Sequence, residues 1–206
     1  VYVAGTTSSN DFPKTTGRFA GEQEAFITKL NPSGNAIVYS HLLGGGGVDE
    51  VFGLAVTPDG NAFITGRTNS SDLPANGFQS SSPESLVFKS TDGGTTWSSA
   101  MRGPSGNRVN HIAVTPSNPN IVYVATNAGF FKSLDGGNQW QLKATFAGQL
   151  LANVSQIALH PSDPAVIFVA TDNGPFLSTD AGETFTLKDN GIEPQTIILP
   201  PVYAIA

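Results

Sequence analysis

The chain has no cysteine among its 206 residues. Disulfide bridges and cysteine-based zinc sites are therefore excluded, although the compartment is not fixed by this absence. Charged residues make up only 13% of the sequence, and the 10 lysines and arginines form no cluster. Because the net charge is −6, nucleic acid and anionic membranes are poor partners. No apolar run approaches the ~20 residues of a membrane span, so we expect no membrane insertion.

Turn-forming residues, in contrast, are abundant. The sequence has 23 glycines and 14 prolines, and serine, threonine and asparagine are frequent. This composition is typical of an all-β protein with short strands and many turns. We expect a secreted, periplasmic or cell-surface location. Since Val1 stands inside a strand pattern without a signal peptide, we also expect the chain to be a piece of a longer one.

One short segment occurs three times, at 90–97, 133–140 and 178–185, and is called here the D-x-G box. Its aspartate can accept hydrogen bonds from backbone N–H groups two or three residues on, and the glycine two residues after the aspartate permits a positive φ. The box is thus predicted to be a structural hairpin turn. Calcium binding is a weaker alternative, because each box offers one carboxylate and calcium takes about six to eight oxygens. The predicted turn residues are Ser90, Asp92, Gly94, Trp97, Ser133, Asp135, Gly137, Trp140, Ser178, Asp180, Gly182 and Phe185.

The D-x-G box resembles the Asp-box (BNR) repeat, S-x-D-x-G-x-T-W. The first copy matches fully, whereas Gln139 replaces the threonine of the second and Phe185 the tryptophan of the third. The resemblance implies a β-propeller with the box between the third and outermost strands of each blade. It indicates no single activity, because sialidases, xyloglucan-cleaving glycosidases, sortilin-type receptors and photosystem assembly factors share this repeat.

The first part of the chain, about residues 1–85, has a different repeat. The segments VYVAGTTSSNDFP, AFITKLNPSGNAIVYSHLLGG and GLAVTPDGNAFITG resemble the SBBP repeat, a bacterial β-propeller repeat. We therefore expect an all-β propeller of four-stranded antiparallel blades, each running strand a, b, c, box, d. The predicted blades are 1–50, 51–108, 109–153 and 154–201.

The last five residues, 202–206, fit the pattern of a first strand, and the chain opens on a second strand. They either complete the first blade and close a ring of four, or begin the next blade of a larger ring. Propellers have ~4–8 blades. We favour the larger ring, whose remaining blades would then be partners of this piece.

Ligands of propellers usually bind the face that carries the b–c loops and the d–a connections. Loops carry function more often than cores do. The candidates on this face are Asp49, Glu50, Arg67, Arg102, Arg108, Asn110, His111, Asn127, Asp172 and Asn173.

No convincing catalytic constellation is present. A sialidase needs an arginine cluster and a tyrosine nucleophile, but the four arginines lack such a context. The tyrosines at 2, 39, 123 and 203 lie in apolar strands, where core packing explains them better. A two-carboxylate glycosidase could use only Asp49 or Glu50 with Asp172. The three histidines lack metal-ligand spacing, so we expect neither metal nor cofactor.

Two functional hypotheses follow. The first is a non-catalytic module that serves as a scaffold or binds protein or carbohydrate. The second is part of an Asp-box glycoside hydrolase whose other catalytic groups lie elsewhere. An assembly factor for a membrane complex is a third, less favoured hypothesis, because the repeat of the first half does not suggest it.

Overall fold

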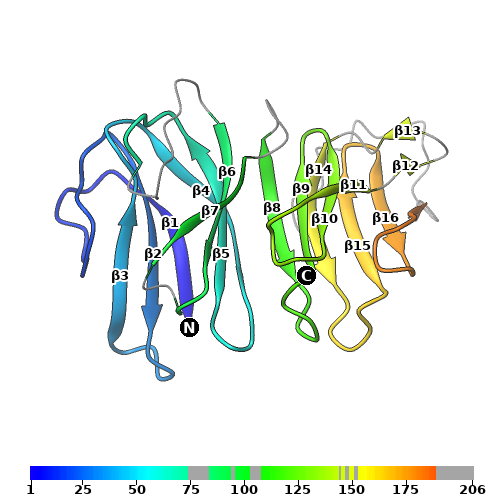
Figure 1. Ribbon diagram of the computed structural model, residues 1–206, viewed down its shortest axis with the longest axis horizontal. Helices are drawn as coiled ribbons and strands as arrows, with labels where there is room; N and C mark the ends of the chain where they lie inside the picture. The colour runs from blue at the N-terminus through cyan, green and yellow to red at the C-terminus, as the bar shows by residue number, and fades with distance from the viewer. Residues whose placement is uncertain are drawn as a thin grey trace. The chain divides into compact units, whose positions relative to one another are not determined.

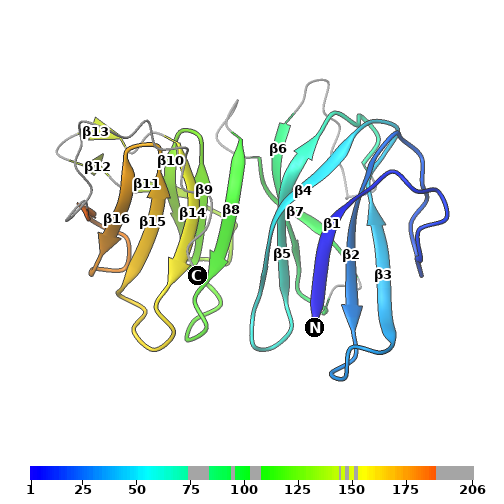
Figure 2. The same ribbon diagram turned by 180° about the vertical axis from the view of Figure 1, so that it is seen from behind.

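The computed structural model describes residues 1–73, 84–93, 96–102, 108–143, 145–146, 149–150 and 153–188, with only the backbone given for 84–86, 99–102, 145–146 and 149–150. The chain divides into two compact units, Val1–Val109 and Asn110–Ala206. Each unit is built of antiparallel sheets (Figures 1 and 2). No helix that is long and apolar enough to cross a membrane occurs in the described part of the chain.

The first unit contains two sheets. The three-stranded sheet has the order β1-β2-β3 and the four-stranded sheet the order β4-β5-β6-β7. A bulge between Val51 and Gly53 interrupts the pairing of β4 with β5. The first sheet lacks a fourth strand among the described residues. The segment 202–206, which would supply that strand under the less favoured closed-ring alternative, lies outside them. The strands are β1 (Tyr2–Thr7), β2 (Glu24–Leu30), β3 (Ile37–Leu43), β4 (Asp49–Val56), β5 (Ala62–Thr68), β6 (Glu84–Ser90) and β7 (Ser98–Arg102).

The second unit contains two four-stranded sheets, ordered β11-β10-β9-β8 and β14-β15-β16-β17. A small hairpin of β12 and β13, which the repeat pattern did not predict, precedes β14. The strands are β8 (Val109–Val114), β9 (Val122–Thr126), β10 (Gly129–Ser133), β11 (Gln141–Lys143), β12 (Thr145–Phe146), β13 (Gln149–Leu150), β14 (Val154–Leu159), β15 (Ile167–Thr171), β16 (Gly174–Ser178) and β17 (Thr186–Leu187).

The two central strands of the first sheet of the second unit are buried on both faces. All five residues of β9 and all five of β10 are buried, which requires side chains from both directions to pack on them. Tyr123 and Phe130 stack at 5.3 Å, and Phe185 meets Phe130 edge-on at 5.1 Å. The aromatic that ends the third box thus belongs to the core, as the pattern of the repeat predicts.

The core of the first unit lies between its two sheets. Ile27 of β2 is fully buried against Ala62 and Ile64 of β5, and Trp97 packs at the rim of this cluster. The side chains alternate along each strand, so one row of β2 faces the second sheet. The long loop before β2 runs beside β3, where Thr16 forms an isolated bridge with His41.

Alternate connections of an up-and-down sheet lie at the same end. The β4–β5, β8–β9 and β14–β15 turns and the boxes therefore lie at one end of their sheets. The β5–β6, β9–β10 and β15–β16 loops lie at the other. This second end, called here the loop end of each unit, carries most of the candidate residues.

Candidate functional site

The second and third D-x-G boxes are fastened internally by their serine and aspartate. The Asp135 carboxylate accepts hydrogen bonds from Asn138 N at 2.9 Å and Gln139 N at 2.8 Å. Ser133 Oγ donates to Asp135 at 2.8 Å and accepts from Gly137 N at 2.8 Å. The acceptor thus reaches three and four residues ahead rather than the two or three predicted. The hydrogen bonds lower the pKa of Asp135, the largest contribution coming from the Gln139 amide.

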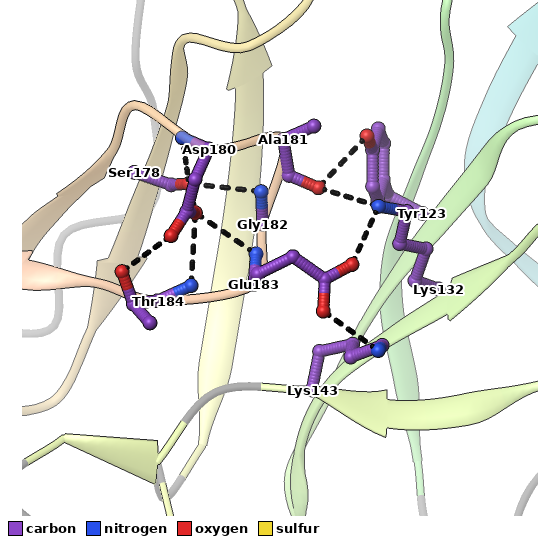
Figure 3. Close-up of polar contacts among 9 residues, drawn as sticks. All are labelled: Tyr123, Lys132, Lys143, Ser178, Asp180, Ala181, Gly182, Glu183 and Thr184. Carbon is purple, nitrogen blue, oxygen red and sulfur yellow. Dashed lines mark hydrogen bonds and ion pairs between the residues drawn. The ribbon is translucent and has the colours of Figure 1, made fainter.

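The third box repeats this pattern (Figure 3). Asp180 accepts from Glu183 N at 3.0 Å, from Thr184 N at 2.9 Å and from Thr184 Oγ1 at 2.5 Å. Desolvation acts to raise the pKa of Asp180. The hydrogen bonds from Thr184, Ser178 and Glu183 outweigh it and lower the pKa to about 2. A carboxylate surrounded by N–H and O–H donors is poorly suited to a cation, which is itself an electron-pair acceptor.

The first box is described only in part, because Gly94 lies outside the described residues. Asp92 accepts from Thr96 N at 2.9 and 3.0 Å and from Thr96 Oγ1 at 2.6 Å. Ser90 Oγ donates to Asp92 at 2.8 Å. The first box therefore shares two hydrogen bonds with the other two boxes: from the serine to the aspartate, and from the N–H four residues on to the aspartate. At the end of the second box, Trp140 donates from Nε1 to Gly137 O at 3.0 Å.

The turns need two consecutive residues with positive φ, not one. Gly137 and Gly182 have φ of 90° and 84°, as predicted from their type. The residue before each also lies in the left-handed region, Gly136 at 68° and Ala181 at 59°. Ala181 is thus a non-glycine residue in a conformation that costs an L-residue about 1–2 kcal/mol.

A lysine pair binds the third box to the neighbouring sheet of the second unit (Figure 3). Lys132, only 6% exposed, donates to Ala181 O and to Glu183 Oε1, both at 2.9 Å. Lys143 donates to Glu183 Oε2 at 2.7 Å, and Tyr123 donates its hydroxyl to Ala181 O at 3.2 Å. Lys143 and then Lys132 lower the pKa of Glu183. This clamp attaches the third box to the sheet that contains β9, β10 and β11.

At the loop end of the first unit, Asp49 is 2% exposed and belongs to β4 rather than to a loop. Its carboxylate accepts from Ser70 Oγ at 2.8 Å, from Gly45 N at 2.9 Å and, at short distance, from Thr68 Oγ1. Asp49 is therefore a structural acceptor that joins three segments of the loop end.

The neighbouring charges of this loop end are also paired. Arg67 and Glu50 stand opposite one another on β5 and β4 and form an ion pair of 2.7 Å. The Arg67 side chain is 52% exposed, so this pair contributes little to stability. Arg108 lies over the Phe52 ring at 4.5 Å. The side chain of Arg102 is outside the described residues.

The loop end of the second unit holds a chain of amides and a carboxylate. Asn110 Nδ2 donates to Val154 O at 2.7 Å and to Asn153 Oδ1 at 3.2 Å. Asn153 Nδ2 donates in turn to both oxygens of Asp172, at 2.9 and 2.8 Å. Asn153, with a φ of 42°, is one of two non-glycine residues with positive φ among those described. The motif analysis did not single it out for this role, although asparagine is a residue type that tolerates the conformation.

The other candidates of this loop end take smaller parts. Asn173 N donates to Thr171 Oγ1 at 3.1 Å, and Asn127 O accepts from Asn153 N at 3.3 Å. His111 is half-buried, its Nδ1 finds no hydrogen-bond partner in the described part of the chain, and burial lowers its pKa. Since Asp49 and Glu50 belong to one unit and Asp172 to the other, the proximity of the predicted carboxylate pair stays a prediction.

One buried acid was missed by the sequence analysis. Glu24, at the start of β2, is 0% exposed and lies at the loop end near Asp49. The local sequence, Glu22-Gln23-Glu24, gives no signal of burial. Within the described ranges, no three histidine, aspartate or glutamate side chains are grouped so as to hold a metal ion.

The comparisons with known proteins define the class as a β-propeller. A family model of the SBBP β-propeller repeat matches residues 38–74, inside the region where the sequence resembles that repeat. No curated protein matches the chain. The all-β propeller fold predicted from the repeats is thereby confirmed, whereas the Asp-box resemblance of the second half rests on its residues alone.

Solved structures agree on the fold. The GH74 enzyme of Niastella koreensis has a TM-score of 0.54 and 20% identity over 83% of this chain and 28% of its own. An ancestral GH74 enzyme has a TM-score of 0.52 and 18% identity, covering 81% of this chain and 23% of its own. A nidogen/laminin complex has a TM-score of 0.51 and 12% identity, covering 86% and 56%. The chain thus spans about a quarter of the GH74 chains, and similarity at this level establishes the fold alone.

Proposed function

We propose that this chain is a non-catalytic β-propeller module of a secreted or cell-surface protein, and that its loop ends bind a protein partner. The observation that supports this proposal is the state of the candidate carboxylates. Asp49 is buried and accepts three hydrogen bonds, Glu50 is paired with Arg67, and both oxygens of Asp172 accept from Asn153. A glycosidase acid or nucleophile must instead reach the sugar.

A protein ligand fits these loop ends better than a sugar. Sugar sites offer exposed aromatic faces, but the exposed large apolar side chains in the described part of the chain are mostly aliphatic and Phe168 is the one aromatic, 36% exposed. The half-exposed guanidinium of Arg67 belongs instead to a residue type that is enriched at protein–protein interfaces. It lies near the end of β5, at the loop end.

Hydrolysis assays on sialyl- and β-glucan-type substrates with the full-length protein test the catalytic alternative. We expect no turnover above the blank. Turnover that disappears in Asp49→Asn, Glu50→Gln or Asp172→Asn, with the melting temperature unchanged, would refute the proposal and favour the glycoside hydrolase.

Photo-cross-linking on the intact source cells tests the binding itself. A photoreactive residue in place of Arg67, at the loop end, is expected to capture a discrete protein. The matched control is Ser33, an exposed residue of the β2–β3 turn at the opposite end of the same unit. Equal capture from both positions, or capture of glycan alone from position 67, would contradict a protein-binding loop end.

A further inference from the structure

Glu24 is a buried carboxyl group without a counter-ion among the described residues. Carboxylates are almost never fully buried unless they are paired, yet Glu24 is 0% exposed. Its Oε1 accepts from Ala20 N and Gly21 N, both at 2.8 Å. Its Oε2 has no hydrogen-bond partner in the described part of the chain. A buried polar oxygen without a partner calls for an explanation.

A second buried carboxylate, that of Asp49, lies close to this oxygen. A Cβ built on Gly44 would stand 1.7 Å from Glu24 Oε2 and 2.6 Å from Asp49 Oδ2, so both oxygens crowd the same point on Gly44. Gly44 has no side chain, and only glycine fits there.

Among the described residues, the charged groups that act on Glu24 are acidic. The carboxylates that act on it are Asp49 of β4 and Asp72 of the loop after β5. Arg18 and Glu22, on the loop before β2, are exposed to solvent. None of the ion pairs formed by the described residues involves Glu24. Desolvation by burial, and then the two carboxylates, raise the pKa of Glu24 against the lowering effect of the Ala20 and Gly21 amides.

We propose that Glu24 and the glycine loop 44–48 form a proton-operated latch. While the loop is closed, Glu24 carries a proton on Oε2 and directs it toward the Asp49 carboxylate, which satisfies the oxygen that otherwise has no partner. When Glu24 loses this proton to water, a third negative charge stands beside Asp49 and Asp72, and the loop opens.

The loop 44–48 is the element that yields, because carboxylates and polar side chains hold it by its backbone. Gly45 N donates to Asp49 at 2.9 Å, and Gly46 N donates to Asp72 at 2.7 Å. Gly47 N donates to Ser70 Oγ at 2.9 Å, and Val48 N to Asn69 Oδ1 at 2.5 Å. Two backbone hydrogen bonds add to these contacts, from Glu22 N to Gly47 O and from Asn69 N to Val48 O, both at 3.2 Å. The four consecutive glycines have no side chains to bury, so the loop is kept closed mainly through its backbone.

The direction of the pH effect follows from linkage. A carboxyl group whose pKa is raised in the closed state stabilises that state fully when the pH is below its ordinary pKa of 4.5. This stabilisation is lost as the pH rises toward the raised pKa. One proton is released per opening, so the opening constant rises about tenfold per pH unit in this window and then levels off.

Amide hydrogen exchange of residues 44–48, corrected for the intrinsic rate and followed from acid to mildly alkaline pH, measures this opening. In the wild type, protection is expected to fall about tenfold per pH unit above the ordinary carboxyl value and then to level off. Glu24→Gln keeps a donor toward Asp49 and cannot ionise, so its protection should be independent of pH. The matched control, Glu22→Gln, removes one charge from the same loop at an exposed position and should retain the wild-type profile.

Asp72→Asn provides a second test should Glu24→Gln fail to fold. Asp72 is exposed, and an asparagine can still accept from Gly46 N. This variant removes one repelling charge, so its protection profile should level off at a lower pH than that of the wild type. A pH-dependent profile in Glu24→Gln, or an unshifted one in Asp72→Asn, would overturn the latch. Protection of the wild type by added calcium chloride that Glu24→Gln lacks would also overturn it, in favour of a cation site.

Discussion

Ala181 carries a testable backbone strain. The third box requires left-handed backbone at Ala181, with a φ of 59°, where the second box has Gly136 with a φ of 68°. Replacing Ala181 with glycine removes only a methyl group. The hydrogen bonds of this residue use only its backbone. Ala181 N donates to Ala165 O, and Ala181 O accepts from Tyr123 and Lys132. The substitution therefore changes the strain while the contacts remain.

The expected gain is the difference between two opposing terms. Relief of the left-handed conformation is worth about 1–2 kcal/mol. Glycine also gives the unfolded chain more freedom, which offsets about 0.4–1 kcal/mol of that relief. Ala181→Gly should then raise the free energy of unfolding by about 1 kcal/mol. For a chain of this size, that corresponds to a rise in melting temperature of about 2–4 °C.

Thermal unfolding followed by calorimetry measures this change. Gly136→Ala, the mirror substitution in the second box, should lower the melting temperature by a similar amount. Gly182→Ala should cost more, because its φ is 84° and the added Cβ would stand 2.8 Å from Phe130 Cε1. A lower melting temperature in Ala181→Gly, or a higher one in Gly136→Ala, would refute the strain argument.

Three further changes test the clamp, the box and the core. Lys132→Met removes two hydrogen bonds of a buried ammonium and should lower the free energy of unfolding by about 2 kcal/mol. Lys143→Met, at the exposed side of the same pair, should lower it by less than about 1 kcal/mol. Equal losses in denaturant unfolding would contradict the clamp. The melting temperature of the wild type should fall as the pH drops from 3.8, the ordinary pKa of an aspartate, toward about 2, the lowered pKa of Asp180. Asp180→Asn should make this fall smaller. An unchanged acid profile in the variant would contradict the hydrogen bonds of the box. Thr65→Val replaces a buried hydroxyl that lacks a partner among the described residues and should raise stability by about 1 kcal/mol, and a loss in denaturant unfolding would contradict that assignment.

The strands were predictable because their pattern repeats. Apolar runs that recur in aligned units, each followed by the same turn, allow few arrangements other than antiparallel blades. The positive φ at Gly137 and Gly182 also followed from residue type. The second left-handed residue did not, because Gly136 and Ala181 differ in type and only the geometry of the turn makes them equivalent.

The contacts between strands and loops were harder to predict from the sequence. Lys132 immediately precedes the box serine, as Lys89 does in the first box, and this recurrence was an available signal for the clamp. The third box has Leu177 at that position. Glu24 offered no signal at all, since its burial depends on loops that are distant in sequence. Its neighbours Asp49 and Asp72 come from the start of β4 and from the loop after β5.

The two ends of the sheets differ in how alike their turns are, and this difference bears on the proposed binding function. The boxes are alike because the same serine and aspartate fasten each turn, so they satisfy their own polar groups and have little left to offer a ligand. The loop ends share no such design: one has a glycine loop held by acids, and the other has amides linked to Asp172. When repeats are constant at one end and differ at the other, the proposed recognition of a partner is expected to use the variable end. A scaffold that keeps its fastening in the boxes can change the loop ends without loss of the fold.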